Sequence, residues 1–501
     1  MSTPVDVGLT GWRRLLVEPR RPEAVRRLRW AHWLVLGTVC IGAFMGQLDA
    51  SIVTMAFPAL RHGFGASLAS VQWVGQAYLL VLVALLMAVG RYADMVGRKL
   101  LYTYGFALFV VASALCGMAP SLWWLVAFRA LQGAGAAMYQ ANSVAILVGA
   151  IPRNRLGRAV GVQGAAQALG LALGPAVGGA LVGLGGWRLI FYVNVPVGAL
   201  GVILAWLLVP RSTHLVGRER FDWTGLALFG PAVASLLLAL SAGQRAGWGS
   251  AATLSLLGTS ALLAVLFLVR ERRARVPLLS LDLFRRLEFS AGIASGLLSY
   301  LVLFGALTIL PFYLEVARRQ PSGRAGLELL VLPLGLAVAA PAAGRLAERF
   351  GARPLTVGGM TLAGAMLLAT TVIGGDLAIT LVGLGGAGLG LGAFTPANNA
   401  AIMGAAPPWL SGLVSGVLNM TRGLGTSLGL AIAGLAYTIG SSGRPAGALA
   451  ARAGYRDAAW VLAAGAALAA VVAATRRPEH VHARRPRVAD RAHKRSDVVR
   501  V

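Results

Sequence analysis

Two charged residues lie inside stretches that are otherwise apolar. Asp49 lies in IGAFMGQLDASIVTMAFPAL (residues 41–60), and Arg129 lies in LWWLVAFRALQGAGAAM (122–138). A charged side chain in a membrane helix costs ~2.5–3.5 kcal/mol even on a lenient insertion scale, so such residues face a cavity or a partner. A carboxylate whose protonation depends on a nearby arginine or bound cation can act as a proton switch. We therefore expect Asp49 and Arg129 to couple protons to another process, with a static ion pair as the alternative.

The elements that hold these charges are expected to be membrane helices. The chain has 501 residues, of which 57% are hydrophobic and 13% charged, against about 25% charged in a soluble domain. Apolar stretches of about 20 residues recur, and each can cross the membrane as a helix, which satisfies its own backbone polar groups. Fourteen spans are expected, near residues 33–57, 71–90, 99–118, 122–147, 158–183, 188–209, 224–243, 251–269, 289–314, 325–346, 354–374, 377–403, 411–439 and 458–474.

The distribution of positive charge predicts the topology. Basic residues gather before residue 30, at 270–277 and after residue 475. By the positive-inside rule both termini lie in the cytoplasm, and the protein is a multi-pass protein of the plasma membrane. We expect the basic ends to contact anionic lipids, and not nucleic acid, because no basic folded domain accompanies the spans. The basic cluster ARRQPSGR (317–324) lies in an external loop and departs from the rule.

This topology places the two charges at a similar depth. Asp49 lies about eight residues from the outer end of the first span, roughly 12 Å deep at 1.5 Å per residue. Arg129 lies about seven residues from the outer end of the fourth span, roughly 10 Å deep by the same rise. The two side chains are therefore expected to meet.

Internal repeats divide the chain into two halves. GRYADMVGRK (90–99) follows the second span and GRLAERFGAR (344–353) follows the tenth, while QGAGAAMYQAN (132–142) matches GGAGLGLGAFTPAN (385–398). Spans one to six thus resemble spans nine to fourteen, which is typical of transporters. We expect an all-α polytopic membrane protein with two pseudo-symmetric six-helix bundles, 33–210 and 289–475. A linker with two extra helices (211–288) joins them, and basic segments (1–32 and 476–501) flank them.

Several ordered motifs resemble those of the major facilitator superfamily, in particular its fourteen-span drug:proton antiporters. GRYADMVGRK is similar to the loop signature after the second span, RALQGAGAAM (129–138) to the fourth-span motif, and GLALGPAVGG (170–179) to the antiporter motif of the fifth span. LDASIVTMAFPAL (48–60), WRLIFYVNVPVG (187–198) and LPFYLEVARRQPSGRAGLELLVLPLG (310–335) resemble further motifs of this branch. Its ninth span often reads L-P-x-Y-x-Q, and Glu315 stands at the Gln position here, a further candidate for proton coupling.

The resemblance implies that the two repeated loops act as a gate that locks one conformation. Asp94 can cap a neighbouring helix or pair with Arg91, Arg98 or Lys99, whereas the alternative is an ordinary basic loop. The expected gate residues are Gly90, Asp94, Gly97, Arg98, Lys99, Gly344, Glu348 and Gly351.

The fifth span carries small residues on one face. Gly170, Gly174 and Gly178 recur every four residues, a spacing that lets two helix backbones touch. Pro175 can bend the helix there, and Gly179 completes the motif. This face either packs helices together or forms a pivot or seal between the two halves.

Other polar residues of the spans are candidates for lining a substrate path. By the same resemblance Gln76 and Gln132 would lie near Arg129. Glu315 and Glu328 lie near the outer ends of their spans, where Glu315 either pairs with the following arginines or attracts a cationic substrate. The expected lining residues are Gln76, Gln132, Asn398, Asn399, Asn419 and Arg422. The resemblance implies an arginine at position 422, which either neutralises a carboxylate of the second half or holds the packing there.

The sequence has no Walker loop, no HExxH and no cysteine and histidine cluster with metal spacing, so we expect neither an enzyme nor a cofactor or metal. We expect a monomeric, proton-coupled exporter of small drug-like or antibiotic-like amphipathic compounds that works by alternating access. The alternatives are an exporter of a dedicated metabolite, such as an amino acid, siderophore or lipid precursor, and a membrane sensor that transports nothing.

Overall fold

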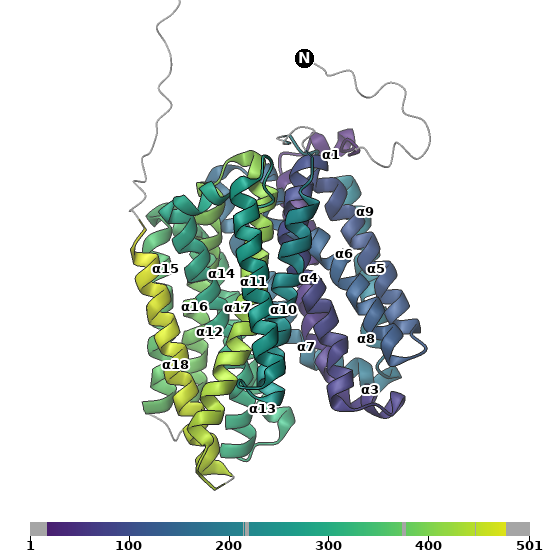
Figure 1. Cartoon of the computed structure of the whole chain (residues 1–501). Helices are drawn as coiled ribbons and strands as arrows, with labels where there is room; N and C mark the ends of the chain where they lie inside the picture. Colours follow the sequence, from purple (N-terminus) through teal and green to yellow (C-terminus); the bar gives the residue numbers. More distant parts are fainter. Residues whose placement is uncertain (1–17, 214, 216–219, 373–376, 446, 477–501) are drawn as a thin grey trace, which may run out of the picture.

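The computed structural model describes residues 18–213, 215, 220–372, 377–445 and 447–476. Within these residues every regular element is a helix, and the long helices run side by side as Figure 1 shows. The expected basic segments 1–32 and 476–501 lie largely outside the described residues.

The first half of the chain forms six spans, some of them built from adjoining helices. They are α2 (Ala31–Ile52) with η2 (Val53–Ala56) and α3 (Phe57–Phe64), α4 (Leu68–Val96), α5 (Arg98–Met118), α6 (Leu122–Ala150), α7 (Leu156–Gly185), and α8 (Leu189–Tyr192) with α9 (Asn194–Leu208). The short helix α1 (Glu23–Arg26) precedes them, and η3 (Arg153–Arg155) lies between α6 and α7.

The inserted spans and the second half follow. The inserted spans are α10 (Trp223–Ala246) and α11 (Ala251–Arg273). The later spans are α12 (Leu287–Phe312) with the π-helical η5 (Tyr313–Ala317), α13 (Ser322–Leu329) with α14 (Val331–Phe350), α15 (Ala352–Val372), α16 (Leu377–Ala405), α17 (Ser411–Ser441) and α18 (Ala448–Ala474). Two short 3₁₀ helices, η4 (Leu281–Arg285) and η6 (Pro408–Leu410), lie between spans.

Thirteen of these helical stretches, among the described residues, are long and apolar enough to cross a membrane. The fourteenth expected span is α6, which has 29 residues. Its hydropathy is lower because it carries polar side chains such as Arg129, Gln132 and Gln140. The all-α fold expected from the repeats is confirmed, with two six-helix bundles and two inserted helices. The boundaries 33–210, 211–288 and 289–475 stay predictions.

Side chains at the loops determine where several spans begin. Ser67, Ser121 and Ser250 each accept a hydrogen bond from the backbone N–H three residues later. Asp222 does the same for α10, at 2.9 Å from the Gly225 nitrogen. Such N-caps satisfy one of the backbone donors that a helix leaves unpaired at its start.

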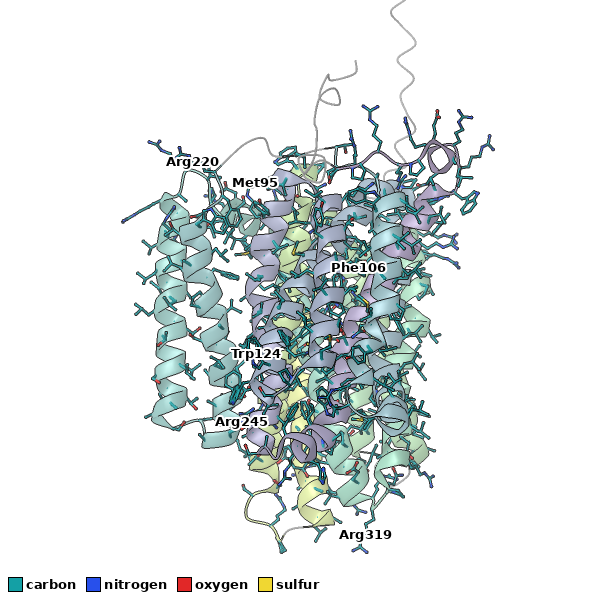
Figure 2. All side chains as sticks on the ribbon, turned by 90° about the vertical axis from the view of Figure 1, so that its right-hand side faces the viewer. Met95, Phe106, Trp124, Arg220, Arg245 and Arg319 are labelled. Carbon is teal, nitrogen blue, oxygen red and sulfur yellow. The ribbon has the colours of Figure 1, made fainter. Side chains whose placement is uncertain are left out.

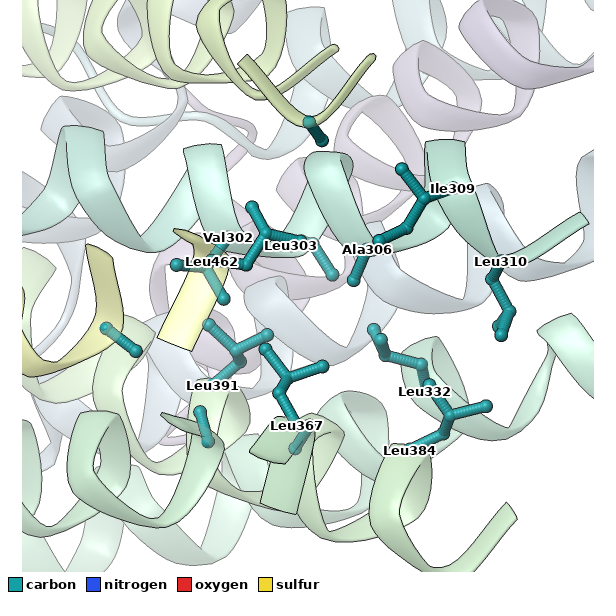
Figure 3. Packing of buried hydrophobic residues seen from close by; sticks show 14 of the residues in the cluster. Val302, Leu303, Ala306, Ile309, Leu310, Leu332, Leu367, Leu384, Leu391 and Leu462 are labelled. Atoms are coloured by element: carbon teal, nitrogen blue, oxygen red, sulfur yellow. The ribbon is translucent and has the colours of Figure 1, made fainter. Parts of the chain in front are cut away.

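Each half has its own apolar core. In the first half, the ring centroids of Phe106 and Phe109 of α5 lie 4.7 and 5.7 Å from that of Tyr139 of α6. In the second half, Figure 3 shows side chains of α12 against Leu332, Leu367, Leu384, Leu391 and Leu462. A third buried cluster joins the two halves, since Val83 and Met87 of α4 share it with Leu413 and Val417 of α17.

The inserted helices form a hairpin on the side of the molecule. Phe229 of α10 and Phe267 of α11 lie with ring centroids 5.2 Å apart. The hairpin contacts both bundles, since Gln76 of α4 donates to Ser241 of α10 at 2.6 Å and Val233 of α10 shares a buried cluster with Val417 of α17. Figure 2 shows Met95 and Arg220 at one end of the molecule and Arg245 and Arg319 at the other. We call these the Asp94 end and the Arg319 end.

Candidate functional site

Asp49 and Arg129 meet inside the first bundle. Arg129 Nη1 donates to Asp49 Oδ2 at 2.7 Å. The exposed fraction of Asp49 is 0% and that of Arg129 is 1%. The structure therefore forms the contact that the similar depth predicted, between α2 and α6. That this pair couples protons stays a prediction.

Side-chain amides complete the coordination of the carboxylate. Asn194, at the start of α9, donates to Asp49 Oδ1 at 2.8 Å, and Gln132 donates to the same oxygen at 3.2 Å. Gln132 also accepts from Arg129 at 2.5 Å and donates to Ser113 of α5 at 3.0 Å. Three donors therefore satisfy the ionised form of Asp49, as a buried charge requires.

The guanidinium of Arg129 is held on its other side by α4. Its Nε donates to the Val74 carbonyl oxygen at 3.1 Å, and its Cζ lies 4.2 Å from the centroid of the Tyr78 ring. The Phe191 ring lies 5.7 Å from the same atom. The site thus joins α2, α4, α5, α6, α8 and α9, and a change in the charge of Asp49 would disturb most of the first bundle.

Glu315 lies far from this pair in the fold. It is exposed in η5 at the Arg319 end. The neighbouring Arg318 donates to the Tyr313 hydroxyl at 3.1 Å, rather than to Glu315. Glu328, the other acid of this region, is bonded to Arg324 at 3.3 Å. Of the expected proton-coupling residues, the structure brings together Asp49 and Arg129 but not Glu315.

The first repeated loop joins the two bundles at the Asp94 end. Asp94 Oδ1 accepts from Arg98 Nη2 at 2.7 Å and from the Gly412 N–H at 2.8 Å, and Oδ2 accepts from the Leu413 N–H at 2.8 Å. The carboxylate therefore caps the first turn of α17, a helix of the second bundle. A Cβ on Gly90 would collide with the Gly412 carbonyl oxygen, so glycine lets the helices meet here.

In the second repeated loop the acid belongs to the second bundle and accepts from a helix of the first. Glu348 Oε1 accepts from the Arg158 N–H at 2.8 Å, in the first turn of α7. Gly344 and Gly157 approach so closely that a Cβ on either would collide with the carbonyl oxygen of the other. Gly97 and Gly351 end α4 and α14 with φ of +120° and +83°, a region that favours glycine. Both loops thus connect the bundles at the same end.

A residue that the sequence did not single out braces the first loop. Glu18 is 9% exposed and its carboxylate accepts from the Lys99 N–H at 3.0 Å. It also accepts from the Ser212 N–H at 2.6 Å and hydroxyl at 2.8 Å. Lys99 Nζ in turn donates to the Pro19 carbonyl oxygen at 2.9 Å. No periodicity or motif in the sequence pointed to Glu18.

The glycine face of the fifth span packs within one bundle. A Cβ on Gly170 would collide with the Phe44 carbonyl oxygen, and one on Gly174 with Ser51, both in α2. The face therefore packs two helices of the first bundle together, and its role as a pivot or seal between the halves stays a prediction. A Cβ on Gly179 would meet nothing within 4 Å. Pro175 lies inside the helix as expected.

The contact between α7 and the second bundle lies nearer the Asp94 end. A Cβ on Gly161 would collide with the Ala340 carbonyl oxygen of α14. The α7 helix therefore holds α2, which carries Asp49, on one face, and the second bundle on another.

A small cavity of about 30 Å³ lies between the two bundles. Its polar lining consists of Gln47, Gln167, Tyr300, Thr395 and Arg422. These residues come from α2, α7, α12, α16 and α17, so both halves contribute, as expected for a substrate path. Of the six residues expected to line the path, Arg422 lies at this cavity.

The other expected lining residues lie elsewhere. Gln132 belongs to the Asp49 site, and Gln76 faces the inserted hairpin. Asn398 donates to the Gly292 carbonyl oxygen at 3.1 Å and accepts from Arg476. Asn419 bridges the bundles by donating to the Gln140 carbonyl oxygen at 2.9 Å. The half-buried Asn399 is not among the residues that line the cavity.

Comparisons with known proteins agree with the architecture. A family model described as Major Facilitator Superfamily matches residues 39–331 and 295–499. The structure resembles the human organic anion transporter MFSD10 (TETRAN), with a TM-score of 0.65, 16% identity, and 88% of this chain and 99% of that chain covered. It also resembles the proton:xylose symporter XylE, with a TM-score of 0.59, 14% identity, and coverage of 88% and 94%. At these identities the likeness concerns the fold alone.

Sequence relatives are more specific. The riboflavin transporter RibZ of Clostridioides difficile (strain 630) is 34% identical over 402 residues, 80% of this chain and 87% of its own. The multidrug resistance protein Stp of Mycobacterium tuberculosis (strain ATCC 25618 / H37Rv) is 35% identical over 404 residues, 80% and 75%. A methylenomycin A resistance protein of Streptomyces coelicolor (strain ATCC BAA-471 / A3(2) / M145) is 32% identical over 397 residues, 79% and 83%.

Proposed function

The chain belongs to the Major Facilitator Superfamily, and on that premise we propose that it is a proton-coupled exporter of small, amphipathic, antibiotic-like compounds. It is a multi-pass membrane transporter, not an enzyme, and is related to drug and antibiotic exporters. The observation that carries the proposal is the buried pair of Asp49 and Arg129. Asp49 belongs to α2, and the same helix lines the cavity through Gln47.

Protonation of Asp49 would disturb the conformation described here. The neutral acid no longer balances the charge of Arg129, and breaking a buried pair costs ~3–5 kcal/mol. The protonated protein therefore favours a packing in which the two groups separate. Proton and substrate would then select different states of the same bundle, which is what an antiporter requires.

The gate contacts suggest which state this is. Both repeated loops close the Asp94 end through Asp94 and Glu348. If that end faces the cytoplasm, as the positive-inside rule predicts, the structure is closed toward the cytoplasm. Release of both contacts would open the path from the cytoplasm. In the proposed function both termini are cytoplasmic, the protein lies in the plasma membrane among anionic lipids, and it works as a monomer.

A transporter of one dedicated metabolite is the second candidate. It is favoured by the similarity to the riboflavin transporter RibZ, which matches this chain as well as the resistance proteins do. Riboflavin and a panel of antibiotics offered to the same preparation would distinguish the two candidates.

Purified protein in proteoliposomes tests the proton coupling. An imposed pH gradient should drive substrate accumulation, and a protonophore should abolish it. Asp49→Asn should insert and fold but lose this accumulation, because the side chain can no longer take up or release a proton. Asp457→Asn is the matched control, since its side chain is 38% exposed. Accumulation by Asp49→Asn equal to that of the control would contradict the proposal.

A further inference from the structure

The cavity between the bundles contains a positive charge and no acid. Arg422 is one of its twelve lining residues, and none of the twelve is Asp or Glu. Asp49, two residues after the lining residue Gln47, is buried in the first bundle and paired with Arg129. Glu315, the acid expected at the mouth, is exposed in η5 and does not line the cavity.

The guanidinium of Arg422 is only partly satisfied. Its Nη2 donates to Asn419 Oδ1 at 3.0 Å, and its Cζ lies 5.5 Å from the centroid of the Tyr300 ring. Its Nε is buried without a hydrogen-bond partner among the described residues. A guanidinium has five N–H donors, so Arg422 retains donors for a ligand.

The other arginine deep in the spans provides the contrast. Arg129 has Asp49 at 2.7 Å, a charge of opposite sign, whereas the ion pairs of the described residues do not include Arg422. A charge within a membrane protein faces a partner or a water-filled path. Arg422 faces the path, and no acidic side chain of the described residues pairs with it.

We propose that the transported compound is an amphipathic organic anion whose carboxylate binds Arg422. Arginine presents paired N–H donors that match the two oxygens of a carboxylate. Leu303, Phe304 and Leu336 line the same cavity and would receive the apolar part of the compound. The inference rests on the proposed function and names the substrate class of that site.

Asn419 is the positioning residue for this arginine. Its Oδ1 accepts from Arg422, while its Nδ2 donates to the carbonyl oxygens of Gln140 and Ser415, each at 2.9 Å. Gln140 belongs to α6 of the first bundle. An anion that displaces Arg422 would weaken its hydrogen bond to Asn419 and so disturb the bond from Asn419 to Gln140. Ligand binding would therefore change the contact between the bundles.

The test compares binding of three probes of similar ring size to the purified full chain in nanodiscs. The probes are a naphthalene carboxylate, its methyl ester, and a naphthalene bearing a quaternary ammonium. Wild-type protein should bind the carboxylate at least tenfold more tightly than the ester. Arg422→Gln should abolish this preference and leave ester binding unchanged, while Arg422→Lys should retain part of it. Arg456→Gln, on the exposed side of α18, is the control.

Equal affinity of the wild type for carboxylate and ester, or tighter binding of the ammonium probe, would overturn the inference. So would a carboxylate preference that persists in Arg422→Gln. If that variant does not insert, Arg422→Lys and the wild-type comparison decide. Carboxylate preference without any proton-driven flux would leave the substrate class standing and reject the proposed exporter. Proton-driven flux of the ammonium probe alone would support the proposed exporter and reject the anionic substrate class.

Discussion

The two repeated loops place an acid at the same position and give it different surroundings. Asp94 is fully buried, accepts from two N–H groups of α17 and is paired with Arg98. Glu348 is half-buried and accepts from the Arg158 N–H of α7. The backbones approach equally closely in both places, through Gly90 and through Gly344.

One position in the repeat accounts for much of this difference. Arg98 follows the second glycine of GRYADMVGRK, and Ala352 occupies the same position in GRLAERFGAR. Glu18 adds a further brace at the first loop. The comparison shows that the two repeated loops share the close backbone approach between the bundles, while most of the polar interactions lie at the first loop.

The largest effect is expected for Asp94→Asn. The change removes the charge that engages Arg98 and the first turn of α17, and loss of a buried pair costs ~3–5 kcal/mol. Hydrogen–deuterium exchange at Gly412 and Leu413 should become at least a hundredfold faster, and transport should be slowed or lost. Asp282→Asn is a control, because that side chain is 86% exposed. If exchange in Asp94→Asn stays unchanged, the Asp94 contact does not hold the two bundles together, and the proposed gating role of the first loop is wrong.

Glycine substitutions should affect the two loops equally. Gly90→Ala and Gly344→Ala each place a methyl group against a carbonyl oxygen of the opposite bundle, and overpacking costs ~1–3 kcal/mol. Both variants should shift the bundles apart at the Asp94 end, measured as the distance between spin labels on α4 and α17 or on α7 and α14. Gly149→Ala, which meets nothing within 4 Å, should leave both distances unchanged. If the distance changes at only one loop, the two loops differ in backbone packing as well as in polar contacts.

Removal of the brace should weaken the first loop alone. Glu18→Ala leaves the Lys99 and Ser212 N–H groups without their acceptor, a loss of roughly 1–3 kcal/mol. Exchange at the start of α5 and of α17 should increase, while exchange at the start of α7 stays the same. Glu23→Ala, an exposed acid nearby, is the control. Faster exchange at α7 as well would mean that the two loops open together.

The smallest effect is expected for Glu348→Gln. A single hydrogen bond from a half-buried carboxylate contributes about 0.5–1.5 kcal/mol, so exchange at Arg158 should increase by less than about tenfold. Ala352→Arg should sharpen the test by supplying the pairing partner that Arg98 supplies to Asp94. If Ala352→Arg slows exchange at Arg158, the missing arginine explains the weaker contact. If exchange at Arg158 stays the same, the deeper burial of Asp94 explains the difference between the two loops.

The sequence could predict the helices because they depend on local patterns. Apolar stretches of membrane length predicted the spans, and the repeated glycines and acids singled out two loops that the structure places between the bundles, while their gating role stays a prediction. Matching depth also predicted that Asp49 meets Arg129. These inferences needed only spacing along one helix or recurrence of a motif.

What could not be predicted depends on the rotation of each helix and on contacts between distant segments. Asn194 lies in a quoted motif, yet its bond to Asp49 depends on where α8 gives way to α9. Glu18 reaches Lys99 and Ser212 across long separations in sequence. The glycine face of α7 was compatible with either neighbour, and only packing shows that it contacts α2.

The carboxylate of Asp94 has a consequence for genetics. Its partners across the gate are main-chain N–H groups, which every residue except proline supplies at positions 412 and 413. No exchange of side chain at those positions can restore what Asp94→Asn removes. A search for second-site suppressors should therefore return changes that favour closure by other means, such as tighter packing between α7 and α14, and no allele-specific partner on α17. For the same reason, paired variation between homologous sequences should fail to reveal this contact.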